Sequence, residues 1–317
     1  MSSLKKPKYI PKPLSLKDFH AKKDQILIWH DKGGLGDVLM QRMMFDDFKS
    51  LFPNSELIFA CLPEYISAVE DHPCISKVLD SRMINPNDYL ACYNTCVSIA
   101  DRYENNHAPS LEHRSDIWAK FCGIELKNHD MRFRLDPILV KSTRKKLEAL
   151  TKNSLPIILF SPTSKMATKT LLPWQIKVIV EETKNYNLVG LHKDEIPELT
   201  KLGIPGIYNI SIKEWMCYLT AADYVISVDS AAFHMAGGLK KPLMGIFTFA
   251  DGVVYGKHFN FVLVQKHRKN GNWDCGPCFK FAGCPKCKTM LKPCLTEISK
   301  EMLTDGIAQL FSKFPLK

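Results

Sequence analysis

Short apolar runs alternate with helical patterns along most of the chain. Residues 25–29 form an apolar run that ends at a glycine-rich turn, and residues 37–51 place large apolar side chains at helical spacing. After a polar break at residues 53–55, residues 56–61 form a second apolar run. A strand, a helix and a second strand in this order are typical of one unit of a parallel sheet.

The alternation continues through the rest of the chain. In the first half we expect a helix at 63–71, a short strand at 78–80, a helix that includes 115–122 and a charged helix at 139–150. Polar residues at 151–154 then break the pattern. For the second half the pattern predicts strands at 156–160, 187–191, 224–228 and 242–247, and helices at 173–184, at 211–222, from 231 and at 296–314.

The chain is long enough for more than one domain. Its 317 residues exceed what one hydrophobic core usually holds, so two domains are expected. We predict a basic tail at residues 1–24, a first domain at 25–152 and a second at 153–317. Repeated strand–helix units in both domains predict the α/β fold class with parallel sheets.

The net charge and the cysteines bear on partners and location. The chain carries 43 Lys and Arg against 33 Asp and Glu, a formal net charge of +10. This charge favours an anionic partner such as a nucleotide, a phosphorylated glycan, a membrane surface or nucleic acid, although a generally basic surface explains it equally well. Residues 1–12 lack the apolar core of a secretion signal, and no window approaches the roughly 20 apolar residues of a membrane helix. With eleven cysteines and no such signal, we predict a cytoplasmic protein with reduced thiols, and contact with the inner membrane surface stays open.

The first candidate site is the turn at residues 32–37, between a predicted strand and a predicted helix. Gly33, Gly34 and Gly36 allow a ligand to approach the backbone, and amide groups at a helix start favour an anion. The turn matches neither the dinucleotide fingerprint nor the phosphate loop of NTPases, so it does not support a dehydrogenase or an NTPase. The alternative is a tight turn in which Asp37 only caps the helix.

The second candidate site is the segment 227–237, which again leads from a strand to a helix. The predicted strand delivers Asp229 to its carboxyl end, where ligands of parallel sheets bind. Ser230 and Ala231 would present backbone amides to a diphosphate, and Asp229 would accept hydrogen bonds from sugar hydroxyls. His234 lies one helical turn later and would face the same ligand, unless it only packs.

The third candidate site is the polar loop at residues 160–170, which follows the first strand of the second domain. Its hydroxyl groups and lysines are suited to neutralising a leaving diphosphate. The alternative is a solvated surface loop.

These three motifs, in this order, resemble glycosyltransferase family 9, the group of the ADP-heptose lipopolysaccharide heptosyltransferases. The matching residues are Gly36-Asp37, Lys169 with Pro173-Trp174, residues 219–223, Asp229-Ser230 and residues 234–236. The resemblance implies two facing Rossmann-like domains of the GT-B type, with the acceptor on the first domain and the donor on the second. It also implies that catalysis needs no metal.

The resemblance further implies a role for each motif. Asp37 would be the catalytic base that deprotonates an acceptor hydroxyl, with inversion at the anomeric carbon, and a raised pKa in a closed cleft would suit that role. Lys169, or Lys165 in its place, would hold the diphosphate together with Thr163 and Ser164.

The resemblance also limits which donor and acceptor substrates are expected. The expected donor is a nucleotide-diphosphate sugar, with an ADP-heptose-like donor favoured. The expected acceptor is anionic: a lipopolysaccharide core, a protein side chain or a hydroxylated base in DNA.

Five of the eleven cysteines lie between residues 275 and 294. Two CxxC pairs have a spacing that suits tetrahedral thiolate coordination of zinc or iron. A relative that glycosylates bacterial autotransporter proteins resembles this chain in having a four-cysteine iron site. We predict a structural zinc or iron ion in a cysteine-rich insertion, and the alternative is a set of reduced thiols. The predicted ligands are Cys275, Cys278, Cys284 and Cys287, with Cys294 as a substitute for one of them.

The same segment suggests a second class of function. Aromatic residues at 273, 279 and 281 lie among lysines, a composition typical of surfaces that stack on bases and contact phosphates. The alternative function is therefore a non-catalytic nucleic-acid-binding protein that uses a metal-bound cysteine knuckle. This alternative leaves the Asp37 and Asp229 motifs without a role.

Overall fold

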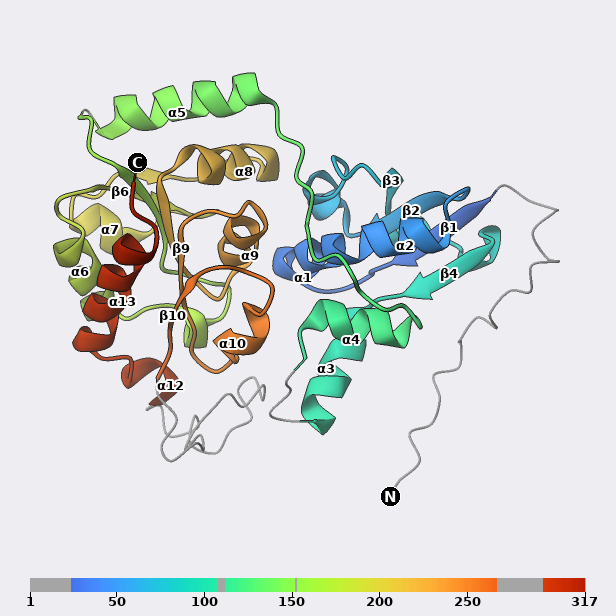
Figure 1. Cartoon of the computed structure of the whole chain (residues 1–317). Helices are drawn as coiled ribbons and strands as arrows, with labels where there is room; N and C mark the ends of the chain where they lie inside the picture. The colour runs from blue at the N-terminus through green and yellow to red at the C-terminus, as the bar shows by residue number, and fades with distance from the viewer. Residues whose placement is uncertain (1–23, 108–111, 152, 267–292, 317) are drawn as a thin grey trace.

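The computed structural model describes residues 24–107, 112–151, 153–266 and 293–316. It contains two α/β halves that lie side by side, each built around its own sheet (Figure 1). In the described residues, the first half has a four-stranded sheet in the order β3-β2-β1-β4 and the second a six-stranded sheet in the order β10-β9-β8-β5-β6-β7. Neighbouring strands pair in parallel in both sheets, which confirms the predicted α/β class.

The first half alternates strands and helices as the sequence predicts. Its elements are β1 (Gln25–Trp29), α1 (Leu35–Gln41), η2 (Arg42–Met44), α2 (Phe45–Leu51), β2 (Glu56–Cys61), η3 (Pro63–Ala68), β3 (Ile75–Asp80), η4 (Ser81–Met83), η5 (Pro86–Asp88), β4 (Ala91–Asn94), α3 (Val97–Asn106) and α4 (Arg114–Phe121).

The second half repeats the alternation after the long helix α5 (Pro137–Thr151). Its elements are β5 (Ile157–Ser161), η6 (Ala167–Lys169), α6 (Pro173–Glu182), β6 (Asn187–Leu191), α7 (Pro197–Lys201), β7 (Gly206–Ile207), α8 (Ile212–Ala221), β8 (Tyr224–Val228), α9 (Ala231–Gly238), β9 (Leu243–Ile246), α10 (Gly252–Tyr255), β10 (Val262–Val264), α12 (Pro293–Thr296) and α13 (Lys300–Lys313).

The central strands β1, β5 and β8 are largely apolar without alternation, as parallel strands covered on both faces usually are. Ile26, Leu27 and Ile28 of β1 are all fully buried, as expected for a parallel strand packed on two sides. The sequence analysis does not predict the four-residue strand β4, because β4 lacks a long apolar run. It nevertheless pairs with β1, and the pairing begins with Ile26 opposite Ala91. The helix predicted at 63–71 is wrong in kind, since this segment forms the short 3₁₀ helix η3.

The helix α5 connects the two halves and packs against α8 of the second half (Figure 1). Its Arg144 donates from Nη1 to Asp223 Oδ2 at 2.9 Å, and Leu147 is buried. The helix predicted to close the first domain therefore lies against the second half. The division of the chain into domains at residue 152 stays a prediction.

In the described parts of the chain, the helices are too short or too polar to span a membrane. This finding concerns the helices alone.

A buried arginine joins three segments of the first half. Arg42 is fully buried, and its guanidinium contacts both carboxylate oxygens of Asp71 at 2.6 and 3.0 Å. It also donates to the carbonyl oxygens of Ala68 and Met131, both at 2.8 Å. The ion pair is fully desolvated on the arginine side, so removal of Arg42 would leave several buried acceptors without a donor.

We predict that Arg42→Met lowers the free energy of unfolding by about 3 to 5 kcal/mol, because it breaks a buried ion pair. The matched control is Arg82→Met, whose arginine is 64% exposed and pairs with Asp80; it should change stability by at most about 1 kcal/mol. Denaturant unfolding measures both. Equal effects of the two substitutions would contradict the structural role of Arg42.

Candidate active site

The glycine turn holds the Asp37 carboxylate over the start of α1. Gly34 donates its backbone amide to Asp37 Oδ2 at 2.8 Å, so Asp37 does cap the helix. Gly33 has φ +125°, and a Cβ at this position would lie 2.9 Å from His30 Nε2 and 3.1 Å from Asp37 Oδ2. A side chain at residue 33 would be strained and would fill the space that these two polar atoms border.

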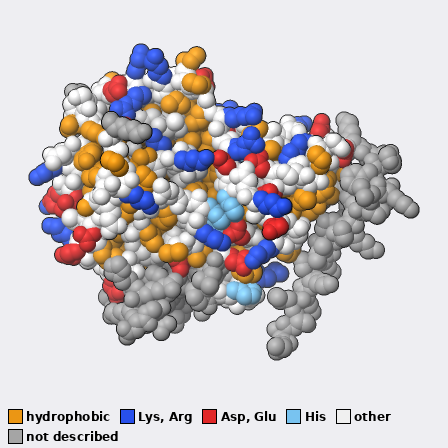
Figure 2. All heavy atoms as spheres, in the orientation of Figure 1, with side chains coloured by type: hydrophobic (Ala, Val, Ile, Leu, Met, Phe, Trp, Pro, Cys, Tyr) orange, Lys and Arg blue, Asp and Glu red, His pale blue; other side chains and the backbone are white. Residues whose placement is uncertain are grey.

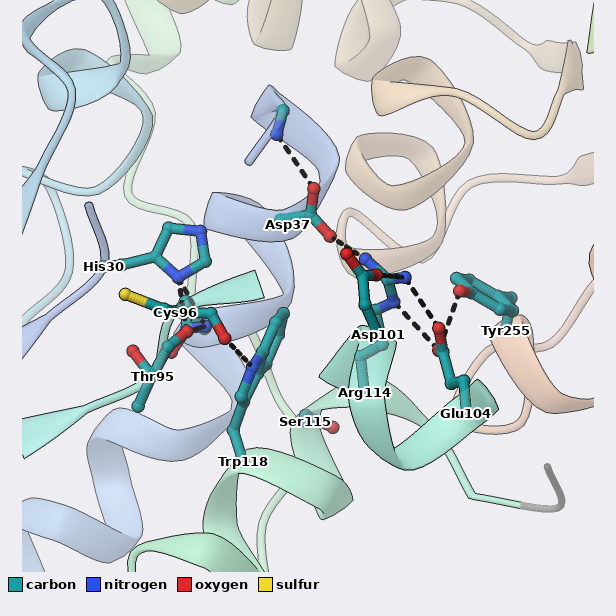
Figure 3. A network of polar contacts seen from close by, with 12 residues as sticks. His30, Asp37, Thr95, Cys96, Asp101, Glu104, Arg114, Ser115, Trp118 and Tyr255 are labelled. Carbon is teal, nitrogen blue, oxygen red and sulfur yellow. Dashed lines mark hydrogen bonds and ion pairs between the residues drawn. The ribbon is translucent and has the colours of Figure 1, made fainter. Parts of the chain in front are cut away.

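The other Asp37 oxygen binds a buried arginine (Figure 3). Arg114 Nη1 donates to Asp37 Oδ1 at 2.7 Å. The same guanidinium contacts Asp101 at 2.6 Å and Glu104 at 2.7 and 2.9 Å, and the Arg114 side chain is only 6% exposed. Tyr255 of the second half donates its hydroxyl to Glu104 at 2.9 Å. One guanidinium thus compensates three carboxylates and connects to both halves of the molecule.

Arg114 decides the ionisation of Asp37. Burial raises the pKa of Asp37, but the Arg114 charge, the Gly34 amide and His30 together outweigh it, so the pKa lies below its usual value. The expectation of a raised pKa is therefore wrong. Asp37 is ionised at neutral pH and can accept a proton, while Arg114 limits its basicity.

His30 is a further polar group beside Asp37 that the sequence analysis did not identify. Its Nδ1 lies 2.6 Å from the Thr95 carbonyl oxygen, which can only accept, and this contact is shorter than that with Gln41 Nε2 at 3.2 Å, so we assign the hydrogen to Nδ1. Nε2 is therefore an acceptor, and it is buried without a hydrogen-bond partner among the described residues. Burial lowers the pKa of His30, against the charge of Asp37.

The position of Arg114 carried one signal that the sequence analysis missed. Arg114 is the first residue of α4, where the helix dipole disfavours a positive charge unless a specific partner compensates it. Its partners lie 10 to 77 residues away in sequence, at Glu104 and Asp37. The side chains of this network could therefore not be paired from the sequence alone.

In the second half, the structure brings together the polar loop and the Asp229 motif. Lys169, the last residue of η6, places Nζ 2.7 Å from Asp229 Oδ2, and the Asp229 side chain is 5% exposed. Nζ of Lys169 also lies 5.2 Å from the centre of the Phe249 ring. Lys165, the alternative, instead contacts the Tyr65 hydroxyl of the first half at 3.5 Å.

The other predicted donor residues lie at the same edge of the sheet. The backbone amide of Ser164 donates to Thr170 Oγ1 at 3.1 Å. Ser230 is the N-cap of α9, but its Oγ lies 3.2 Å from Ser227 Oγ and makes no capping hydrogen bond to the helix. Ala231 begins α9. The start of α9 is thus formed without a side-chain cap, which leaves its first turn available to an anion.

Several buried polar atoms at this edge lack a partner within the described ranges. They are Oγ1 of Thr163 and Thr168 after β5, Nδ1 of His234 in α9, and Oγ1 of Thr248 after β9. Buried polar atoms in folded proteins are nearly always hydrogen-bonded. Their concentration at the carboxyl ends of three neighbouring strands indicates a site for a polar ligand.

His234 lies where the two halves meet. A Cβ on Gly36 would approach its Cδ2 to 3.1 Å, so a side chain at residue 36 would crowd the contact between α1 and α9. Burial lowers the pKa of His234 to about 4, against the charges of Asp229 and Asp37. His234 is therefore neutral at neutral pH, and it lies near both candidate aspartates.

The predicted metal ligands Cys275, Cys278, Cys284 and Cys287 lie outside the described residues. Cys294 is described: it lies in α12 and is buried in the hydrophobic core.

The comparison with protein families decides the class of protein. The model of glycosyltransferase family 9 (heptosyltransferase) matches residues 98–280, which is more than half of the chain. The chain belongs to glycosyltransferase family 9. It is accordingly a glycosyltransferase, as the three motifs predicted. No curated protein sequence gives a significant match.

Solved structures of this family share the fold. The family 9 glycosyltransferase from Veillonella parvula has TM-score 0.69 at 11% identity, covering 92% of this chain and 98% of the other. The dodecameric iron-containing heptosyltransferase TibC of enterotoxigenic E. coli, in complex with ADP-D-beta-D-heptose, has TM-score 0.70 at 17% identity, covering 92% and 77%. The ADP-heptose lipopolysaccharide heptosyltransferase II of E. coli has TM-score 0.60 at 9% identity, covering 91% and 99%. These likenesses support the GT-B arrangement of the two halves.

The ion pair between Lys169 and Asp229 gives a testable energetic coupling. Lys169→Met and Asp229→Asn should each lower the free energy of unfolding by about 1 to 3 kcal/mol, because each leaves a largely buried group without its partner. The double variant should lose less than the sum, by at least about 0.5 kcal/mol. Denaturant unfolding of the four proteins measures this coupling, and additive effects would contradict the ion pair. Lys165→Met is the control, expected within about 0.5 kcal/mol of wild type.

Proposed function

We propose that this glycosyltransferase moves a sugar from a nucleotide-diphosphate donor to an acceptor hydroxyl with inversion of configuration. The observation that carries the proposal is the group of buried, unpartnered polar atoms beside the Lys169–Asp229 ion pair. The donors and acceptors of a diphosphate and a sugar would satisfy them. An ADP-heptose-like donor is favoured, since TibC is in complex with ADP-D-beta-D-heptose.

Different residues of the second half would bind the diphosphate and the sugar of the donor. Lys169 and the first turn of α9 offer positive charge to a diphosphate, and they can stabilise it as it leaves. Thr163 and Ser164 lie in the same loop. Once Lys169 contacts the diphosphate, the Asp229 carboxylate is free to accept hydrogen bonds from sugar hydroxyls.

The residues of the first half would activate the acceptor. Asp37 is ionised, and its Oδ2 and His30 Nε2 border the same space above Gly33. An acceptor hydroxyl placed there would donate its hydrogen to Asp37 Oδ2 and lose this proton to Asp37 as its oxygen attacks the anomeric carbon and the diphosphate leaves. Arg114 would keep the carboxylate in place during the transfer.

The acceptor is proposed as an anionic molecule: a lipopolysaccharide core, a protein side chain or a hydroxylated DNA base. On the face seen in Figure 2, Lys and Arg side chains are interspersed with Asp and Glu side chains. Since duplex DNA needs a line of positive charge, a steep salt dependence of binding would favour DNA over the other acceptors. The family assignment favours a transferase over a non-catalytic nucleic-acid-binding protein, which we do not propose.

A structural zinc or iron ion held by the CxxC pairs is also proposed. The donor set of four thiolates suits either metal, and the related TibC is iron-containing. The buried position of Cys294 in the core favours the four other cysteines as ligands. The cytoplasmic location stays a prediction.

We predict that ADP and an ADP-sugar stabilise the protein against heat more than UDP, GDP or CDP and their conjugates. A ligand at about 100 times its Kd adds about 2.7 kcal/mol to stability. Lys169→Met should lose the effect of both ligands, and Asp229→Ala should lose only the extra effect of the sugar. Lys165→Met is the matched control and should retain both effects. Failure of every nucleotide to stabilise the wild type would contradict the donor site.

We predict that Asp37→Asn lowers kcat about 10² to 10⁴-fold while it leaves donor binding unchanged, because it removes the proton acceptor. Initial rates and calorimetric titration with the donor separate these effects. A comparable loss of donor affinity would show that Asp37 serves the donor instead.

We predict that Arg114→Gln moves the acid limb of the pH–activity profile upward by about 1 to 3 pH units. The reason is that the Arg114 charge opposes the effect of burial, so its removal raises the pKa of Asp37. Arg82→Gln, which alters an exposed pair, is the control. An unchanged acid limb would show that Asp37 does not set it.

A further inference from the structure

A second group of polar side chains lies at the boundary between the two halves. Asp116 comes from α4 and His129 from the segment after it, whereas His258 follows α10 in the second half. One ligand atom of each residue lies within 4.8 Å of the others. The side chains are 15%, 28% and 11% exposed, so the cluster can be reached from solvent. In Figure 2 histidine side chains reach the surface between the halves, beside charged ones.

The distances in this group suit a metal ion. His129 Nε2 lies 3.2 Å from Asp116 Oδ1, and His258 Nε2 lies 3.3 Å from Asp116 Oδ2. Both separations are at the long end of the N–H···O hydrogen-bond range of about 2.7 to 3.2 Å. They match the edge of a tetrahedron with metal–ligand bonds of about 2.0 to 2.1 Å, which is about 3.3 to 3.4 Å long. A small divalent ion would therefore fit these distances once the His129 ring turns, because two rings stacked nearly parallel do not direct both Nε2 lone pairs at one ion.

The histidine rings are arranged so that both Nε2 atoms face one carboxylate. The rings of His129 and His258 stack with centres 3.6 Å apart, at an angle of 17°. The ring of the buried His113 packs edge-on against His258 at 4.9 Å. These contacts fix the orientation of His258, as metal-binding histidines require.

The Lys257 ammonium group already lies beside the Asp116 carboxylate. Lys257 Nζ lies 3.1 Å from Asp116 Oδ2, and the lysine side chain is 49% exposed. The Asp116 carboxylate thus already pairs with a cation, and the exposed lysine is free to swing away from an incoming ion.

We propose that Asp116, His129 and His258 bind a divalent transition-metal ion that bridges the two halves. Two imidazoles and one carboxylate select ions such as Zn²⁺, Co²⁺, Ni²⁺ or Fe²⁺ over Mg²⁺ and Ca²⁺, which prefer oxygen ligands. Water completes the coordination. This site uses none of the cysteines proposed as metal ligands and does not depend on the proposed donor or acceptor.

An ion at this position would affect how the two halves contact each other around Arg114. Asp116 lies two residues after Arg114 in α4, and His258 lies three residues after Tyr255. Arg114 binds Asp37, and Tyr255 binds Glu104 of the same network. An ion at this site would therefore hold the two halves in the arrangement in which the Arg114 network is complete.

The test is a titration of the full-length protein, cysteines included, with Co²⁺ followed by visible absorption, and with Zn²⁺ followed by calorimetry. The wild type should bind one equivalent more than His129→Gln or His258→Gln, and the extra Co²⁺ should show ligand-field bands without thiolate charge transfer. Loss of one ligand should weaken this equivalent by at least about 100-fold. His107→Gln, which changes an exposed histidine outside the cluster, is the matched control and should bind like the wild type.

A second variant distinguishes specific metal binding at this site from weak binding to the protein surface. Lys257→Met removes the competing cation and should tighten Zn²⁺ binding on the order of tenfold. The heat stability of the wild type, but not of His129→Gln, should rise with Zn²⁺. Equal stoichiometry and affinity in the wild type and both histidine variants would overturn the proposal, as would unchanged affinity in Lys257→Met. Because no sugar donor is present, these outcomes leave the proposed transferase function untouched.

Discussion

The ion pairs of the buried Arg114 guanidinium are the interactions on which the candidate active site depends. Three carboxylates, those of Asp37, Asp101 and Glu104, surround it, and burial of such a group without the arginine would be very costly. The network also receives Tyr255 from the second half, so it links the contact between the two halves to the charge of Asp37. Arg114 keeps the candidate base ionised and fixed, at the cost of a lower basicity.

The close approach of the two halves depends on small residues. Gly36 lets α1 pack on α9 so that His234 lies against the turn that carries Asp37. The absence of a side chain at Gly33 leaves the space bordered by His30 and Asp37. The glycines of the turn therefore allow α1 to contact α9 and keep the space beside Asp37 open, in addition to any direct binding of an anion.

The sequence predicted the parts of the site that lie where a strand meets a helix. The Asp37 turn and the Asp229 motif each follow a buried apolar run, so their place at the carboxyl ends of strands could be inferred from local pattern. The pKa of Asp37 could not, because it is set by an arginine 77 residues away. His30 was missed for a related reason: its unpartnered Nε2 is evident only when the Thr95 carbonyl is seen to bind Nδ1. Short β4 had too little apolar pattern to predict.

The most direct test of the account is the configuration of the sugar when it first leaves the donor. In the proposed arrangement, an ionised Asp37 on one half faces a donor held by the other, and it would direct the attacking oxygen to the face opposite the departing diphosphate. With water in place of the acceptor, proton NMR at early times should show released sugar of the opposite anomeric configuration to the donor, and Asp37→Asn should release almost none. Release with the donor's own configuration, or undiminished release by the variant, would contradict the account.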